Sequence, residues 1–165
     1  MPAPRRARFS HQSIAEVSKH LSIEPVRVVI DTQTLLDWQF FVNPACANWT
    51  LPGTAAGWRW LATPAMRDEL AHVLARGFGP RWSTPSKHVL AFFSTHATLV
   101  EAGLPDAAAA RTLRCTDTDD QKFIDLALAL RPARLVSRDR AVLKLARRAA
   151  AHGVEILPPH RWQTT

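Results

Sequence analysis

Cysteine is scarce in this chain, which has only Cys46 and Cys115 among its 165 residues. The two thiols do not form a Cys-x-x-Cys pair, so they indicate neither a zinc site nor a disulfide framework. We expect two packed or idle thiols in a reducing compartment.

Long apolar runs are also absent. The clearest ones are 28–30, 89–93 and 126–130, all much shorter than the roughly 20 residues that a membrane-spanning helix needs. The basic N-terminus, MPAPRRARFSHQS, lacks the apolar stretch of a secretory signal. We therefore expect a cytoplasmic protein that does not contact a membrane.

Acidic residues are outnumbered by basic ones, 14 to 21, which gives a formal net charge of +7. A basic surface favours a polyanionic partner, because neutralising phosphates releases their condensed counterions. The apolar share of 47% and the charged share of 21% are ordinary for a folded protein. The length suits one domain and is too small for two.

We divide the chain into a basic N-terminal arm (residues 1–24), a folded domain (25–160) and a C-terminal tail (161–165). The arm contains a candidate short helix at 14–21. Runs of β-branched and aromatic residues predict strands at 26–30, 58–62, 98–101, 134–137 and 154–157. Apolar residues at helical spacing predict helices at 32–41, 63–76, 85–96, 118–131 and 139–150. Alternating strands and helices predict an α/β fold, with a mostly parallel sheet and helices on both faces.

Two of these helices have recognisable start signals. Thr63-Pro64 combines a hydroxyl N-cap with proline at the first helical position, and Gly77 ends the same helix. Thr118-x-x-Gln121 has the spacing of a capping box.

Acidic residues follow the predicted strands, where ligands gather in open α/β sheets. Asp31 comes directly after the first strand, and Asp139 lies two residues past the end of the strand that precedes it. Asp119 and Asp120 open the helix that follows Thr118, and Glu69 lies about two turns into an earlier helix. Carboxylates brought together repel each other and need a compensating cation. Oxygen ligands select Mg²⁺ or Mn²⁺, so an acidic centre in a basic chain fits nucleic-acid cleavage.

Each acidic residue also has a purely structural interpretation. Asp31 and Asp139 are placed to cap the helices that follow them. Asp119 and Asp120 are favourable charges at a helix start, and Glu69 fits a solvated helix face. Spacing alone leaves both interpretations open.

Three segments resemble PIN domains. VVIDTQTLLDWQFF, from Val28 onward, is similar to their opening strand, Asp and hydroxyl residue. TPAMRDELAHVL (63–74) is similar to their second motif. CTDTDDQKFIDLALALRPARLVSRDRAVL (115–143) resembles the Asp-Asp-Asn/Gln-Lys-Phe and Thr-Gly-Asp segments of PIN toxins from bacterial toxin–antitoxin pairs. The resemblance covers roughly residues 26–158.

The resemblance implies a single PIN-like domain that acts as a metal-dependent endoribonuclease, with Mg²⁺ or Mn²⁺ and no covalent intermediate. Asp31, Glu69, Asp120 and Asp139 match the four acidic positions that bind metal in such domains, and Asp119 is an additional candidate ligand. The implied partners are an RNA substrate and a cognate antitoxin protein that blocks the site. A homodimer is left open.

The chain departs from the family pattern at three positions. Gln33 stands where Asn is usual, Arg138 where Gly or Asn is common, and Ala141 where a further Asp is often found. Arg138 either binds phosphate or forms an ion pair with Asp139 that weakens the metal site. Arg138 and Ala141 support an alternative, a catalytically inactive PIN-fold module that binds RNA or protein. A phosphatase of small esters is disfavoured, because Gln33 stands where that chemistry expects a second Asp.

The predicted helix at 139–150 has a basic face opposite an apolar one. Its basic residues, together with Arg138, are our RNA-binding candidates: Arg138, Arg140, Lys144, Arg147 and Arg148. A merely solvated face is the competing interpretation. Trp38 and Trp49 are candidates for stacking on bases.

Overall fold

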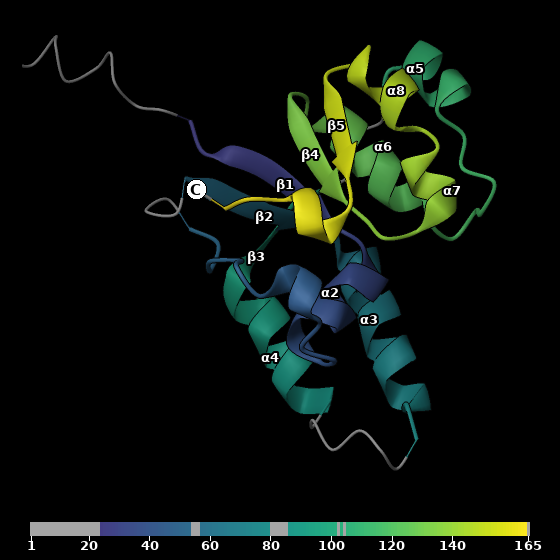
Figure 1. Cartoon of the computed structure of the whole chain (residues 1–165). Helices are drawn as coiled ribbons and strands as arrows, with labels where there is room; N and C mark the ends of the chain where they lie inside the picture. The colour runs from purple at the N-terminus through teal and green to yellow at the C-terminus, as the bar shows by residue number, and fades with distance from the viewer. Residues whose placement is uncertain (1–23, 54–56, 80–85, 102, 104, 165) are drawn as a thin grey trace, which may run out of the picture.

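The structure is a computed structural model that describes residues 24–53, 57–79, 86–101, 103 and 105–164 (Figure 1). The helix expected at 14–21 lies outside the described residues. Of the helices in the described part of the chain, none combines the length and the apolar character that crossing a bilayer requires.

The centre of the fold is a five-stranded sheet in the order β3-β2-β1-β4-β5, in which every pairing is parallel. The strands are β1 (Val26–Ile30), β2 (Trp58–Ala62), β3 (Ala97–Leu99), β4 (Ala133–Val136) and β5 (Val154–Leu157). Four of them lie within one residue of their predicted bounds. The third is shorter than predicted at its end, although the N–H of Val100 still donates to the carbonyl of Ala62 at 2.9 Å.

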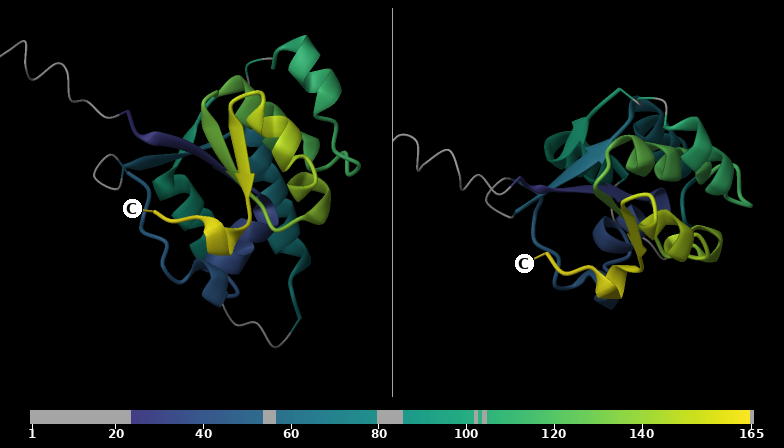
Figure 2. Two further views of the ribbon diagram at one scale, coloured as in Figure 1. Left: turned by 45° about the horizontal axis from the view of Figure 1, so that its top comes forward. Right: turned by 90° about the horizontal axis from the view of Figure 1, so that it is seen from above.

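Helices cover the sheet in two groups. They are α2 (Thr32–Gln39), α3 (Pro64–Arg76), α4 (Ser86–His96), α5 (Ala107–Thr112), α6 (Gln121–Ala129), α7 (Arg140–Leu143) and α8 (Ala146–Ala150). The chain steps in one direction across the sheet from β1 to β3, then in the other through β4 to β5. Right-handed crossovers therefore place α2–α4 and α5–α8 on opposite faces. Figures 1 and 2 show the two groups apart, which confirms the predicted α/β class.

The predicted signals of α3 are confirmed. The Thr63 hydroxyl accepts the N–H of Met66 at 3.4 Å, and Pro64 is the first helical residue. Gly77 ends the helix with φ of 70°, a left-handed value that glycine adopts without steric cost.

The prediction of a capping box at Thr118 is wrong. The helix begins at Gln121 instead, and no side chain caps it. The Gln121 side chain accepts the N–H of Cys115 at 2.8 Å and donates to the carbonyl of Leu113 at 3.2 Å. It also donates to Asp125 at 2.8 Å. Gln121 therefore holds the preceding loop rather than closing a cap.

The single helix expected at 139–150 is also wrong, because α7 and α8 are separate. The N–H of Leu145 reaches back three residues, to the carbonyl of Val142 at 3.0 Å, which tightens the chain between them. This turn keeps Val142, Leu145 and Ala149 buried, as predicted for the apolar face. The predicted apolar face is therefore buried, although the helix that should present it is interrupted.

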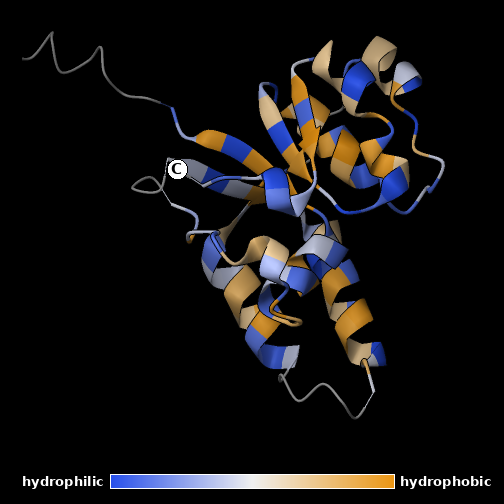
Figure 3. Ribbon diagram, viewed as in Figure 1, coloured by the Kyte–Doolittle hydropathy of each residue, from blue (hydrophilic) through white to orange (hydrophobic). Residues whose placement is uncertain are grey.

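The core lies between the sheet and these helices, and Figure 3 shows hydrophobic residues along β1, β4 and β5. Trp58 and Trp60 are both buried on one face of β2. Trp38 packs against Trp49 and Phe92, with ring centroids 5.1 and 5.0 Å apart. The two rings considered for base stacking are thus packing residues: Trp49 is buried and Trp38 is half-buried.

Candidate active site

The candidate site lies where β1 and β4 end side by side. The chain leaves β1 toward β2 and leaves β4 toward β5, on opposite sides. A crevice opens at the carboxyl ends of two such strands, and ligands bind there in open α/β sheets. The N–H of Asp31 donates to the carbonyl of Val136 at 3.2 Å, which fixes the two strand ends together. Asp31 and Asp139 are therefore brought to one place from distant parts of the sequence.

Asp31 is buried, with 3% of its surface exposed, and it caps α2. Its Oδ1 accepts the N–H of Thr34 at 2.5 Å, whereas Oδ2 is buried without a partner among the described residues. Burial raises the pKa of this carboxyl, and the charge of Asp139 adds to the effect, while the nearby polar groups of Ser137 and Thr34 counteract it. A buried acceptor without a partner is costly, so the free oxygen indicates a place for a ligand.

Asp139 caps α7 in a similar way. Its Oδ1 accepts the N–H of Ala141 at 2.6 Å, and its own N–H donates to the Ser137 hydroxyl at 3.0 Å. The structural interpretation of Asp31 and Asp139 as caps is therefore correct. It does not exclude a functional role, because each cap occupies only one carboxylate oxygen.

Asp120 lies at the start of α6 but makes no cap. Its pKa is raised to about 6, first by burial and then by repulsion from Asp31, Asp139, Asp117 and Glu69. A helix start normally favours the ionised carboxylate, and here that effect is outweighed. The fold thus brings together the four acids predicted from the sequence, with Asp117 as a fifth that we did not foresee.

Glu69 has a cationic partner within the fold. The Nζ of Lys122 on α6 lies 2.5 Å from Oε2 of Glu69 on α3, and the side chains are 30% and 28% exposed. Lys122 also donates to the backbone carbonyl of Asp119. This ion pair offsets one of the negative charges at the site and ties two helices together.

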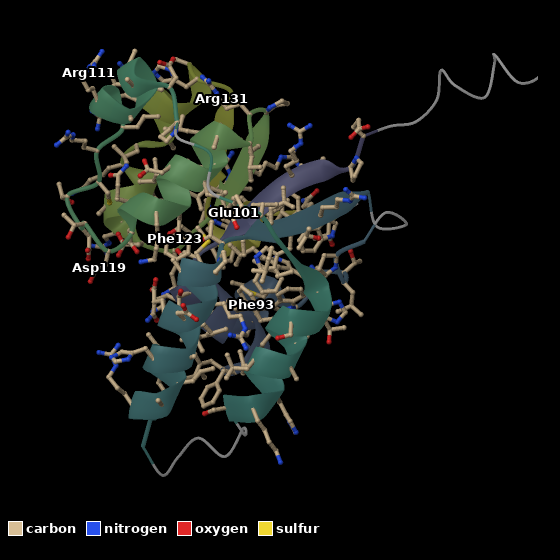
Figure 4. All side chains as sticks on the ribbon, turned by 180° about the vertical axis from the view of Figure 1, so that it is seen from behind. Phe93, Glu101, Arg111, Asp119, Phe123 and Arg131 are labelled. Atoms are coloured by element: carbon tan, nitrogen blue, oxygen red, sulfur yellow. The ribbon has the colours of Figure 1, made fainter. Side chains whose placement is uncertain are left out.

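Asp119 differs from the other candidates. It is exposed, and Figure 4 shows it on the outer side of the loop before α6. Its N–H donates to the Asp117 carboxylate at 2.9 Å, and it is not among the acids that repel Asp120. The run of acids in TDTDD was the available signal for Asp117, but spacing could not tell which of them raises the pKa of Asp120.

Arg138 does not pair with Asp139, the ion-pair partner that the sequence suggested. Its Nη1 lies 2.7 and 2.6 Å from the two carboxylate oxygens of Asp37 on α2. These hydrogen bonds raise the pKa of Arg138, and attraction from Asp31 adds to them. Asp37 was not predicted as this partner, because it stands among the apolar residues of α2 and matches no motif.

The remaining basic candidates are exposed. Arg140 lies on α7, Lys144 between the two short helices, and Arg147 and Arg148 on α8. Arg148 donates to the carbonyl of Thr112 at 3.0 Å. They follow one another along the outside of the fold, although not on one continuous helix.

The donor chemistry fits a hard divalent cation. Every acid at the site offers oxygen, which suits Mg²⁺ or Mn²⁺ better than zinc. Within the described residues, no three His, Cys, Asp or Glu side chains stand close enough together to enclose an ion. Mg²⁺ commonly keeps several waters and takes only one or two carboxylates from the protein. The orphaned oxygen of Asp31 and the mutually repelling acids therefore fit a hydrated ion.

Comparison with known proteins adds one finding. A family model described as the PIN domain matches residues 27–141, which is most of the chain. The matched segment begins in β1 and ends in α7, so it includes every acid of the site. No curated protein matches the chain in sequence.

Proposed function

The chain belongs to the PIN-domain family, whose members are usually nucleases, and from this premise we propose that it is a metal-dependent endoribonuclease. One observation carries the proposal. The pKa of Asp120 is raised to about 6, first by burial and then by four other carboxylates, two of which, Asp31 and Asp139, follow the central strands β1 and β4. A fold keeps such repelling charges together when a cation offsets them. This arrangement suits the hydrolysis of a phosphodiester bond within an RNA strand.

Asp31, Asp120, Asp139 and Glu69 are the proposed acids around a hydrated Mg²⁺ or Mn²⁺, of which at most two bind the ion directly and the others act through its water. Bound there, the ion would supply positive charge that polarises a water and the phosphodiester. Contacts within the protein orient these acids before an ion binds. The cap bonds of Asp31 and Asp139 fix the direction of their carboxylates, and Lys122 holds Glu69.

The exposed basic residues beyond the site are the proposed contacts to the RNA backbone: Arg140, Lys144, Arg147 and Arg148. The net charge of +7 supports a polyanionic substrate. The motifs shared with PIN toxins support a role as the toxin of a toxin–antitoxin pair, with a cognate antitoxin that covers the acidic crevice. A homodimer stays an open prediction.

The test is cleavage of a mixed single-stranded RNA pool by the purified full chain, with Mg²⁺, with Mn²⁺ and with EDTA. We expect cleavage that requires metal and is lost in Asp120→Asn. Glu155→Gln is the matched control, because it also removes one negative charge but lies on the edge strand β5, paired with Arg134. Cleavage that persists in EDTA, or that Asp120→Asn retains, would overturn the proposal.

A second candidate is the catalytically inactive module that binds RNA or protein. The ion pair between Lys122 and Glu69 favours it, because a cation already occupies one of the acids. The same experiment separates the two. RNA retained by the folded protein without cleavage under either metal would favour the binding module.

A further inference from the structure

The pair formed by Asp37 and Arg138 has no place in the site described so far. Asp37 is 4% exposed, and a carboxylate buried so completely needs a charged partner. Arg138 supplies that partner through one nitrogen, Nη1, while 52% of its side chain is exposed. The pair therefore fixes a cation whose remaining surface faces outward.

Arg138 has hydrogen-bonding capacity to spare. Among the described residues, only Asp37 accepts a hydrogen bond from its guanidinium, and it does so from Nη1 alone. The N–H groups of Nε and Nη2 are left without an acceptor there. Arg138 also precedes Asp139 directly and is attracted by Asp31, so it stands beside the acidic crevice.

An arginine beside these acids can either pair with them or stay free to bind another anion. The acids of the crevice attract it, and pairing with them would fill the site with a cation, as we expected from the sequence alone. Asp37 prevents this, because it binds the guanidinium from the side of α2. The planar guanidinium can hold one anion with one edge and another with its remaining N–H groups, which lysine cannot do.

We propose that Asp37 is a positioning residue that keeps Arg138 away from the site acids, so that the free N–H groups of Arg138 bind a non-bridging oxygen of the scissile phosphate. The inference rests on the proposed function and deepens it. Phosphate approaching a cluster of carboxylates is repelled, and a fixed donor at its edge offsets that repulsion. Because Asp37 holds the donor in advance, little reorganisation is needed when charge builds up on the phosphate oxygens.

The test is steady-state cleavage of a defined RNA, over a range of RNA concentrations, by Arg138→Gln, Arg138→Lys, Asp37→Asn and the double variant Asp37→Asn/Arg138→Gln. We expect Arg138→Gln to lower kcat about 100-fold with a smaller change in KM, and Arg138→Lys to recover only part of it. Asp37→Asn lowers kcat in the presence of Arg138 and has little further effect in its absence, because Asp37 acts through Arg138. Arg134→Gln, from the exposed pair with Glu155, is the matched control and cleaves normally.

Two results would overturn the inference. One is a kcat of Arg138→Gln equal to that of the unaltered protein. The other is an effect of Asp37→Asn that is the same with and without Arg138, which would mark the pair as a structural link between α2 and the end of β4. Arg138→Gln alters a half-exposed side chain, so it tests the contact even if Asp37→Asn does not fold.

Binding of the same RNA in EDTA, where the proposed metal-dependent cleavage does not occur, separates this inference from the proposed function. Loss of one phosphate contact in Arg138→Gln should reduce the salt slope of the affinity by about 0.7. If the unaltered protein cleaves but Arg138→Gln changes neither kcat nor binding, only this inference fails. If nothing is cleaved, the proposed function fails and binding alone decides: a smaller salt slope supports the phosphate contact, and an unchanged slope refutes it.

Discussion

Neutralising Asp120 should make the protein more stable. Its pKa is raised from 3.8 to about 6, first by burial and then by the neighbouring carboxylates. The folded state therefore binds this proton more tightly than the unfolded state does between about pH 4 and pH 6. Stability falls wherever the folded state binds more protons as pH rises. The ionised carboxylate thus destabilises the metal-free fold at neutral pH, and Asp120→Asn removes that cost without losing a cap bond.

The magnitude follows from the same shift. A rise from 3.8 to about 6 corresponds to roughly 3 kcal/mol without screening. Asp120 is partly exposed, so water and salt screen the repulsion and we expect about 1 kcal/mol. In a chain of this size that raises Tm by about 2–4 °C.

The assay is thermal unfolding of Asp120→Asn and the unaltered protein in EDTA, across a range of pH. The variant should melt higher at about pH 8, and the difference should shrink as the pH falls and vanish below about pH 4, where Asp120 of the unaltered protein is protonated in both the folded and the unfolded state. Asp119→Asn is the control and should give no rise, because Asp119 is exposed and does not act on Asp120. A variant that melts no higher than the unaltered protein at about pH 8 would refute the reasoning.

Three further predictions concern other parts of the molecule. Asp31→Ala should lose about 1 kcal/mol of unfolding free energy relative to Asp31→Asn in urea titrations, because only Asn can still accept the N–H of Thr34; equal values would exclude the cap. Leu135→Ala, at a fully buried position of β4, should cost about 2–5 kcal/mol in the same titrations, and a loss below 1 kcal/mol would contradict the packing of the sheet. Cys46 is buried with a pKa raised to about 12, by burial first and by Asp37 second, so mass spectrometry should find it unlabelled by iodoacetamide until the protein unfolds; rapid labelling in the native state would show that it is accessible.

Most strands and helices could be predicted from local sequence signals. The run from Val26 to Ile30 is apolar and β-branched, and Thr63-Pro64 with Gly77 marked both ends of α3, so each assignment needed only neighbouring residues. The interruption at Leu145 was not predictable in this way. It depends on the tight turn that lets α7 and α8 bury one apolar face between them, and the sequence keeps helical spacing across the break.

In the candidate site, too, the residues within motifs were predictable and the tertiary contacts were not. Motif resemblance pointed to the acids whose pairwise repulsion the structure now shows around Asp120. Spacing could not show that Arg138 turns to Asp37 instead of Asp139, because the choice depends on how α2 lies against the end of β4. It also could not separate Asp117 from Asp119, since both lie in one acidic run and only the path of the loop decides which of them lies near enough to act on Asp120.

The order of strands has a consequence for when the site comes into being. Asp31 directly follows β1 and Asp139 follows β4, and the two residues meet only when β4 pairs with β1. During synthesis, a nascent chain that has not yet released β4 holds one half of the crevice without the other. An incomplete product that ends before β4 would lack it permanently. If the proposed nuclease function holds, unfinished chains would therefore lack the complete set of acids that it needs.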